Sequence, residues 1–85
     1  MRAYIEDLKG KYYGTSIRYF VNDCPCSIEV WNHTDCHTPS QRQLDYWEMT
    51  YEEAKDDGMM CDSHYETEND YNIAKIIVEA LNKEK

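Results

Sequence analysis

The sequence has few positive charges and no long hydrophobic run. Its 85 residues include 17 Asp and Glu against 9 Lys and Arg, which gives a formal net charge of -8. Such a surface repels phosphate, which argues against direct binding of nucleic acid or of an anionic membrane. No stretch approaches the roughly 18 apolar residues of a membrane span, and the first residues lack an apolar leader. We therefore expect a cytoplasmic protein.

Motifs typical of catalytic sites are also missing. There is no Gly-rich turn that could form an oxyanion hole, and sequence neighbours such as Cys36 and His37 rarely face each other as a nucleophile and its base must. The paired carboxylates are adjacent in sequence, and adjacent residues on a helix diverge by about 100°. They also lack the spacing of an EF-hand calcium loop. We expect a protein that is not an enzyme and uses no cofactor.

The cysteines and histidines leave one metal hypothesis open. In a cytoplasmic chain the four cysteines should be reduced thiols. Thiolates and imidazoles are zinc ligands, and Cys61 and His64 have the two-residue gap of a chelating pair. The other candidate ligands are Cys24, Cys26, His33, Cys36 and His37. Because these lack the C-x2-C or H-x3-H pairs of zinc modules, we favour no metal and keep a zinc-stabilised protein-interaction module as the alternative.

Hydrophobic periodicity predicts an α+β fold. Residues 15–31 alternate in two runs around the turn-forming Asn-Asp-Cys-Pro segment, which predicts an antiparallel hairpin. A C-terminal helix is predicted after a cap at Thr67, with an apolar stripe of Ile73, Ile76, Ile77, Ala80 and Leu81. This helix needs a sheet to cover. We expect a single domain over residues 1–85 with one core, in which a small antiparallel sheet of three to four strands packs against the helix.

The remaining segments give weaker patterns. Residues 3–9 place three apolar side chains on one helical stripe, which predicts a short helix. Residues 32–43 are polar and aperiodic and are predicted to be a loop. Alternation predicts a third strand over residues 44–49 and a fourth over residues 59–66. Between them, a threonine and a glutamate with capping-box spacing predict a short helix over residues 50–58.

Most of the negative charge lies in one part of the chain. Residues 45–70 hold ten carboxylates and a single lysine, so the rest of the sequence is close to neutral. These carboxylates fall on predicted strands and helices, where folding would fix their positions and where like charges repel each other. Aromatic residues, which anchor protein interfaces, lie between them. We predict partner contacts by Asp45, Tyr46, Trp47, Glu48, Tyr51, Glu52, Glu53, Asp56, Asp57 and Asp62.

The small size, the acidity, the one-sheet layout and the carboxylate and aromatic series from Asp45 to Tyr71 resemble the phage-encoded anti-CRISPR and DNA-mimic inhibitors. That class shares no signature sequence, so no residue role is transferred from it. The resemblance implies a cytoplasmic inhibitor that binds the basic DNA- or RNA-handling surface of a host nuclease complex. A homodimer that buries the aromatic residues of the sheet is a further possibility.

Overall fold

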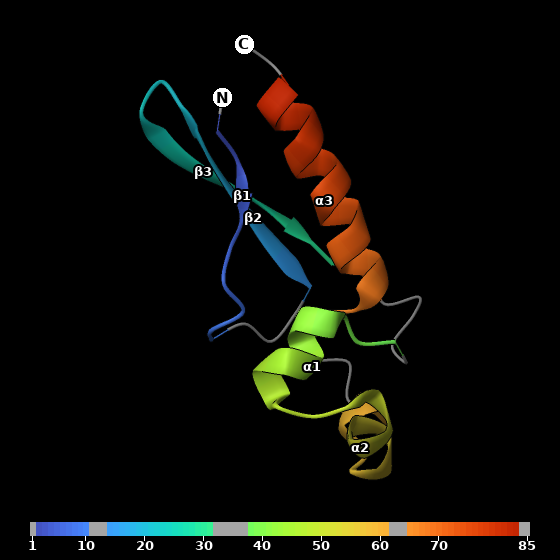
Figure 1. Cartoon of the computed structure of the whole chain (residues 1–85). Coiled ribbons are helices and arrows are strands. Elements are labelled where there is room, and N and C mark those ends of the chain that lie inside the picture. Colours follow the sequence, from blue (N-terminus) through green and yellow to red (C-terminus); the bar gives the residue numbers. More distant parts are fainter. Residues whose placement is uncertain (1, 11–13, 32–37, 62–64, 84–85) are drawn as a thin grey trace.

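The computed structural model describes residues 2–10, 14–31, 38–61 and 65–83. Its elements are β1 (Tyr4–Ile5), β2 (Thr15–Val21), β3 (Cys24–Val30), α1 (Gln41–Trp47), α2 (Tyr51–Asp56), the 3₁₀ helix η1 (Met59–Cys61) and α3 (Glu68–Lys83). Helix α3 lies along the sheet, and α1 and α2 extend beyond one end of that pair (Figure 1). The molecule measures 46 × 21 × 18 Å. The predicted α+β layout, with an antiparallel sheet and a C-terminal helix, is confirmed.

The hairpin forms as its alternation predicts. The strand order is β1-β2-β3, all antiparallel, and Ile17 on β2 is paired with Ile28 on β3. The turn is shorter than the predicted Asn-Asp-Cys-Pro segment, because Asn22 and Asp23 alone adopt positive φ values of 50° and 67°. Two such residues suit the right-handed twist of a hairpin. Pro25 instead lies in β3, where an edge strand tolerates the missing amide donor.

Helix α3 covers one face of the sheet and forms the first hydrophobic cluster. Its fully buried Ala74 packs with Ala3, Ile17 and Val30. Partly buried side chains surround this centre: Ile5, Tyr19, Ile28, Ile73, Ile77, Val78 and Leu81. The predicted stripe was wrong at Ile76, which is 67% exposed, and at Ala80. The side of α3 that faces the strands carries the small Ala74 side chain, which allows the helix to approach them closely. Ile76 lies on another side of the helix and points away from the strands.

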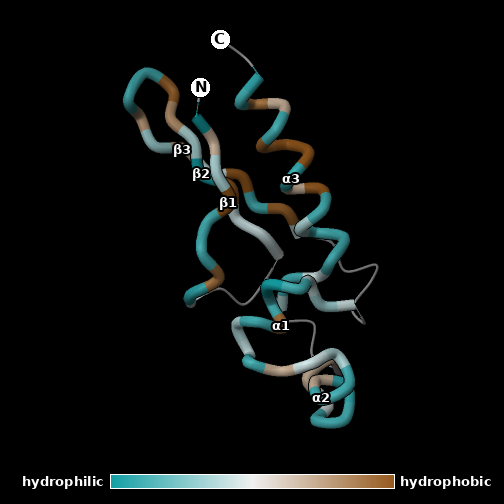
Figure 2. The backbone as a smooth tube through the Cα atoms, in the orientation of Figure 1, coloured by the Kyte–Doolittle hydropathy of each residue, from teal (hydrophilic) through white to brown (hydrophobic). Residues whose placement is uncertain are grey.

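A second hydrophobic cluster lies among α1, α2 and η1. Leu44, Ala54, Met60 and Tyr65 are buried in it. Trp47, Met49 and Met59 pack around them. The expectation of one core was therefore wrong, because α1 and α2 bury their apolar sides against each other and against η1 and Tyr65, away from the sheet. Hydrophobic residues mark α3 and the strands, whereas α1 and α2 are mostly hydrophilic along the backbone (Figure 2).

Two of the predicted elements, the helix near the N-terminus and the fourth strand, are wrong. Residues 3–9 are not a helix, because Tyr4 and Ile5 pair with Arg18 and Ile17 as the edge strand β1. So short a segment gains little from an isolated helical turn, whereas pairing places Ile5 in the first cluster. The predicted strand over 59–66 begins instead as η1, and residues 62–64 lie outside the described part of the chain.

The predicted third strand over 44–49 is also wrong, and so is the last part of the predicted loop over 32–43. Helix α1 begins at Gln41, because the Ser40 hydroxyl accepts a hydrogen bond from the Gln43 amide at 3.0 Å and caps the helix. Short apolar runs fit either period, and here the cap and the packing of Leu44 in the second cluster favour the helix. Residues 32–37 lie outside the described residues.

The sheet carries two aromatic side chains on the face opposite α3. Tyr4 and Phe20 lie on it and are 48% and 50% exposed. Arg18 donates a hydrogen bond from Nε to Glu6 Oε2 at 2.6 Å, and this bond raises the pKa of Arg18. The homodimer hypothesis concerns these aromatic residues, and it stays a prediction.

Candidate functional site

Nine of the ten predicted partner-binding residues lie on α1, on α2 or at their C-terminal ends, while Asp62 lies outside the described residues. The acidic α1–α2 face is defined here as the six exposed carboxylates Asp45, Glu48, Glu52, Glu53, Asp56 and Asp57. Tyr46 and Tyr51 lie beside them and are 50% and 42% exposed. The structure therefore brings most of the predicted set together on two consecutive short helices.

Helix α2 presents its carboxylates because its other side is buried. Thr50 and Glu53 form the predicted capping box, in which the Thr50 amide donates to Glu53 Oε1 at 2.9 Å and the Glu53 amide donates to Thr50 Oγ1 at 3.2 Å. Ala54 is fully buried against α1 and η1. Glu52 and Asp56 are four residues apart and project from one exposed side. Glu53 therefore has a structural role in addition to its charge.

Helix α1 contributes fewer exposed side chains than the sequence predicts. Asp45 is exposed and accepts a hydrogen bond from Gln41 Nε2 at 3.0 Å. Trp47 was predicted to be a partner contact, but it is half-buried and its ring meets the Tyr65 ring edge-on, with centroids 5.5 Å apart. Its position three residues after Leu44 places it on the side of α1 that packs into the second cluster. Tyr65 is a core residue of the second cluster, and the partly buried Trp47 packs against that cluster.

A buried carboxylate, Glu66, holds α1 to the sheet, and no local pattern in the sequence predicts its role. Glu66 is 1% exposed and accepts hydrogen bonds from Thr15 Oγ1 at 2.5 Å and from the Ser40 hydroxyl. Arg42 donates to both oxygens of Glu66, with Nη2 at 2.8 Å from Oε1 and Nε at 3.0 Å from Oε2. The three partners are 51, 26 and 24 residues away in sequence, so no local spacing could reveal them.

Further hydrogen bonds reinforce the same junction. The amide of Glu66 donates to Gln43 Oε1 at 2.7 Å, and its carbonyl accepts from the Ser40 amide at 3.0 Å. Arg42 also donates from Nη1 to the Glu6 carbonyl at 3.0 Å. The start of α1 is thus bonded to the chain before α3 and to the end of β1. Because these groups are buried or partly buried, they fix the orientation of α1 more firmly than surface contacts would.

Tyr71 was expected to belong to the acidic aromatic surface, but cations surround it. Its ring centroid is 5.2 Å from Arg42 Cζ and 4.7 Å from Lys75 Nζ. Both distances are within the range of a cation–π contact. Tyr71 therefore supports the Arg42 side chain that bonds Glu66, and it is only half-exposed.

The structure describes only part of the possible zinc-ligand set. Cys24 and Cys26 are free thiols on β3, and Cys26 Sγ lies 3.6 Å from the Cys24 carbonyl oxygen. His33, Cys36, His37, His64 and the side chain of Cys61 lie outside what the structure describes. Among the described residues, no three or more His, Cys, Asp or Glu side chains gather into a possible metal site. The zinc module stays a prediction.

Comparisons with protein-family models, with curated proteins and with solved structures find no match to this chain. Within the described part of the chain, no helix has the length and apolar character needed to cross a bilayer.

Proposed function

We propose that this protein is a non-enzymatic, anti-CRISPR-like inhibitor whose acidic α1–α2 face docks on the basic nucleic-acid-binding surface of a host protein complex. One observation carries the proposal. Six exposed carboxylates occur on two consecutive helices, and the buried Glu66 junction ties the first of these helices to the sheet. A carboxylate array held in place in this way can meet lysine and arginine side chains that otherwise bind phosphates.

The like charges on α2 lower the stability of the folded protein, and a surface that only keeps the protein in solution would not require them. Glu52 and Asp56 form a like-charge pair at i and i+4, which destabilises a helix by about 0.2–0.5 kcal/mol. Lys55 is the only cation on α2. Repulsion of this kind is relieved when a cationic partner binds. Opposite charge on the two surfaces would also speed their encounter and make association sensitive to salt.

Tyr46 and Tyr51 would supply apolar contact area at this interface, since both rings are substantially exposed. Trp47 is left out of the contact set because it packs in the second cluster. We place this activity in the cytoplasm, where the nucleic-acid-handling complexes of a host cell work. The inhibitor would act without a cofactor.

The test begins with capture of proteins from a host lysate by the tagged protein. A captured DNA- or RNA-handling complex is then purified, and its affinity is measured with and without competing duplex DNA. We expect duplex DNA to compete with the protein for the complex. We expect Glu52→Lys combined with Asp56→Lys to weaken binding more than tenfold, because two interfacial charge pairs are lost. The neutral pair Glu52→Gln and Asp56→Asn should weaken it less. Glu53 is left intact because it caps α2.

The matched control reverses two carboxylates that are not among the six of the face, Asp7→Lys and Glu79→Lys, which changes the net charge by the same amount. This variant should keep most of the affinity. If the control loses as much affinity as the variant on α2, total charge matters and the face does not. Capture of no nucleic-acid-handling protein, or unchanged binding after reversal of Glu52 and Asp56, would rule out the proposed function.

A further inference from the structure

Two cysteines lie on one face of the edge strand β3, next to the hairpin turn. Cys24 and Cys26 are two residues apart, and side chains at i and i+2 of a strand point to the same side. Farther along the strand, this face carries Ile28 and Val30, which pack in the first cluster. Both cysteines are free thiols, Cys24 exposed and Cys26 half-buried. In Figure 1 the turn of this hairpin extends away from α3, so an ion in solvent can reach the pair.

Strand pairing and a proline fix the backbone around the two thiols. Cys24 is paired with Val21 across the turn, and Cys26 is paired with Tyr19. Pro25 lies between the cysteines, and its ring holds the φ angle at about −65°. The Cys26 Sγ atom lies 3.6 Å from the Cys24 carbonyl oxygen, so this sulfur leans back along the strand toward Cys24. The hairpin therefore presents the thiols as a pair with a set spacing.

This spacing suits a bridging ion better than a direct disulfide. Two residues of an extended strand cover about 6.6–6.8 Å. Disulfides mostly join Cα atoms that are about 5.5–6 Å apart, and about 6.8 Å is the usual upper limit. An ion between two thiolates needs a sulfur–sulfur distance of about 4.6 Å, if each bond is as long as the roughly 2.3 Å of a zinc–thiolate bond. Sulfurs that lean toward each other from this spacing can reach that distance.

The donor atoms select a soft ion. The residues opposite the two cysteines, Val21 and Tyr19, supply neither a carboxylate nor an imidazole. Over the part of the chain that the structure describes, no group of three His, Cys, Asp or Glu side chains gathers into a metal site. Structural zinc takes four ligands, and calcium and magnesium take oxygen ligands, so two thiolates suit none of these ions. Cu(I) prefers thiolates and is satisfied by two of them in a linear arrangement.

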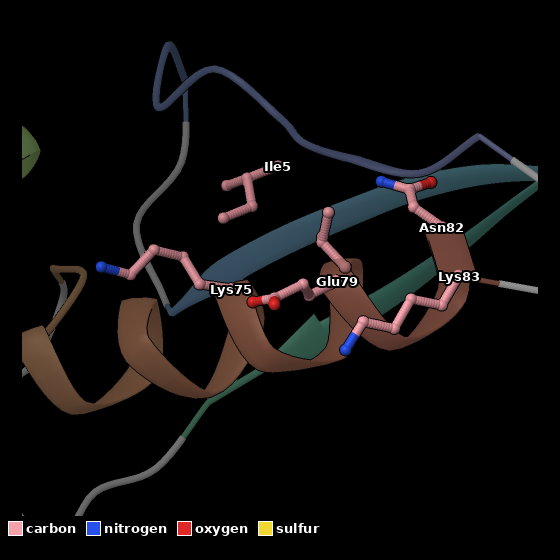
Figure 3. Close-up of a pocket in the computed structure, with 6 residues that line it drawn as sticks. Ile5, Lys75, Glu79, Asn82 and Lys83 are labelled. Carbon is pink, nitrogen blue, oxygen red and sulfur yellow. The ribbon is translucent and has the colours of Figure 1, made fainter.

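A groove on the opposite edge of the sheet offers a different kind of surface. It runs between β1 and α3 and has a volume of about 440 Å³. It is lined by Ile5, Lys75, Val78, Glu79, Asn82 and Lys83. Glu79 lies between the two lysines along α3 (Figure 3), so the single carboxylate has cationic neighbours on both sides. These residues carry no sulfur or imidazole, and a soft cation should therefore prefer the thiol pair on β3.

We propose that Cys24 and Cys26 bind one Cu(I) ion as a two-coordinate thiolate site. Each thiol loses its proton as its sulfur bonds to the ion, so uptake of one Cu(I) releases two protons. The net charge of -8 favours the approach of a cation. The site differs from the zinc module, which draws ligands from several parts of the chain. It goes beyond the proposed function and does not depend on it, because the acidic α1–α2 face contains no cysteine.

The test is an anaerobic titration of the reduced full chain with Cu(I) in competition with the chelator bathocuproine disulfonate. We expect tight binding, two sulfur ligands in the X-ray absorption spectrum of the bound copper, and amide shift changes centred on Cys24 and Cys26. Loss of a group that only orients a metal ligand already costs about 10–100-fold in affinity. Replacing both ligands, with Cys24→Ser and Cys26→Ser, should therefore weaken binding more than about a hundredfold.

Two further variants are matched controls. Cys36→Ser with Cys61→Ser removes the same number of thiols elsewhere in the chain and should bind Cu(I) almost as well as the unmodified protein. Cys26→Ser with Ser27→Cys keeps all four cysteines but moves one thiol to the other face of β3. Its affinity should fall as far as that of the variant without Cys24 and Cys26. Circular dichroism checks that every variant keeps the fold.

Three results would overturn the proposal. The first is unchanged affinity after replacement of Cys24 and Cys26. The second is unchanged affinity when the thiol is moved from position 26 to position 27, since the strand geometry would then be irrelevant. The third is loss of binding in the Cys36 and Cys61 variant, or a third ligand in the X-ray absorption spectrum, which would assign the metal to a larger group of cysteines and histidines.

Discussion

Arg42, which is partly exposed, and Glu66, which is fully buried, form an ion pair that joins the two hydrophobic clusters of this protein. The Arg42 side chain is 26% exposed and the Glu66 side chain 0%, and Nη2 lies 2.8 Å from Oε1. A carboxylate without solvent contact needs such partners, since an uncompensated buried charge costs several kcal/mol. The pair therefore sets the position of α1, and through α1 the position of the acidic face.

Removing Arg42 should lower the stability of the whole molecule. We expect Arg42→Ala to cost about 2–4 kcal/mol, less than the upper range for buried pairs because the guanidinium is partly exposed. Urea unfolding followed by far-UV circular dichroism measures the change. Arg42→Lys keeps the positive charge but loses the bidentate contact with Glu66, so it should recover only part of the lost stability. A loss below about 0.5 kcal/mol for Arg42→Ala would contradict this role for the pair.

The capping box predicts a local effect on α2. Thr50→Ala removes the hydroxyl that accepts the Glu53 amide and should cost about 1 kcal/mol. The readout is hydrogen exchange of the Ala54 amide, which donates to the Thr50 carbonyl at 3.0 Å and should become less protected. Glu52→Gln is the control, because it leaves the box intact. Equal exchange in the two variants would show that the box does not hold α2.

The two aromatic neighbours on α1 should behave differently. Trp47 packs against Tyr65, so Trp47→Ala should destabilise the protein by about 2–4 kcal/mol. Tyr46 is 50% exposed, and Tyr46→Ala should change stability by less than about 0.5 kcal/mol. Thermal or urea unfolding compares them. Similar losses for both variants would mean that Tyr46 is also needed for packing and is not available to a partner.

Two glycines with positive φ offer a matched pair. At Gly14, φ is +44° and an added Cβ would lie 1.9 Å from the Val30 carbonyl oxygen, which is backbone and cannot move away. At Gly10, φ is +78° but no atom of the described residues lies within 4 Å of an added Cβ. We expect Gly10→Ala to cost about 1 kcal/mol from backbone strain alone, and Gly14→Ala clearly more. Urea unfolding of both proteins tests the order, and the reverse order would refute the close approach.

The sequence alone determined the elements whose signals are local. The hairpin over 15–31 follows from alternation around the turn-forming Asn-Asp-Cys-Pro segment, the box at Thr50 from two residues three apart, and α3 from a cap and a long apolar stripe. Exposure of the carboxylates on α1 and α2 also follows from their composition, since Asp and Glu are almost never buried without partners. These features depend on residues that are close together in the sequence, so the residue pattern is enough to predict them.

Tertiary structure decided what depends on distant partners. Residues 44–49 fit a strand or a helix, and Ser40 capping with burial of Leu44 selected the helix. In the sequence, Glu66 cannot be distinguished from the surface carboxylates around it. In the structure it is buried by partners up to 51 residues away. Within segment 3–9, Tyr4 and Ile5 form an edge strand because β2 is there to pair with them. In each case the local preference was weak, and the free energy of burial or pairing with a remote element exceeded it.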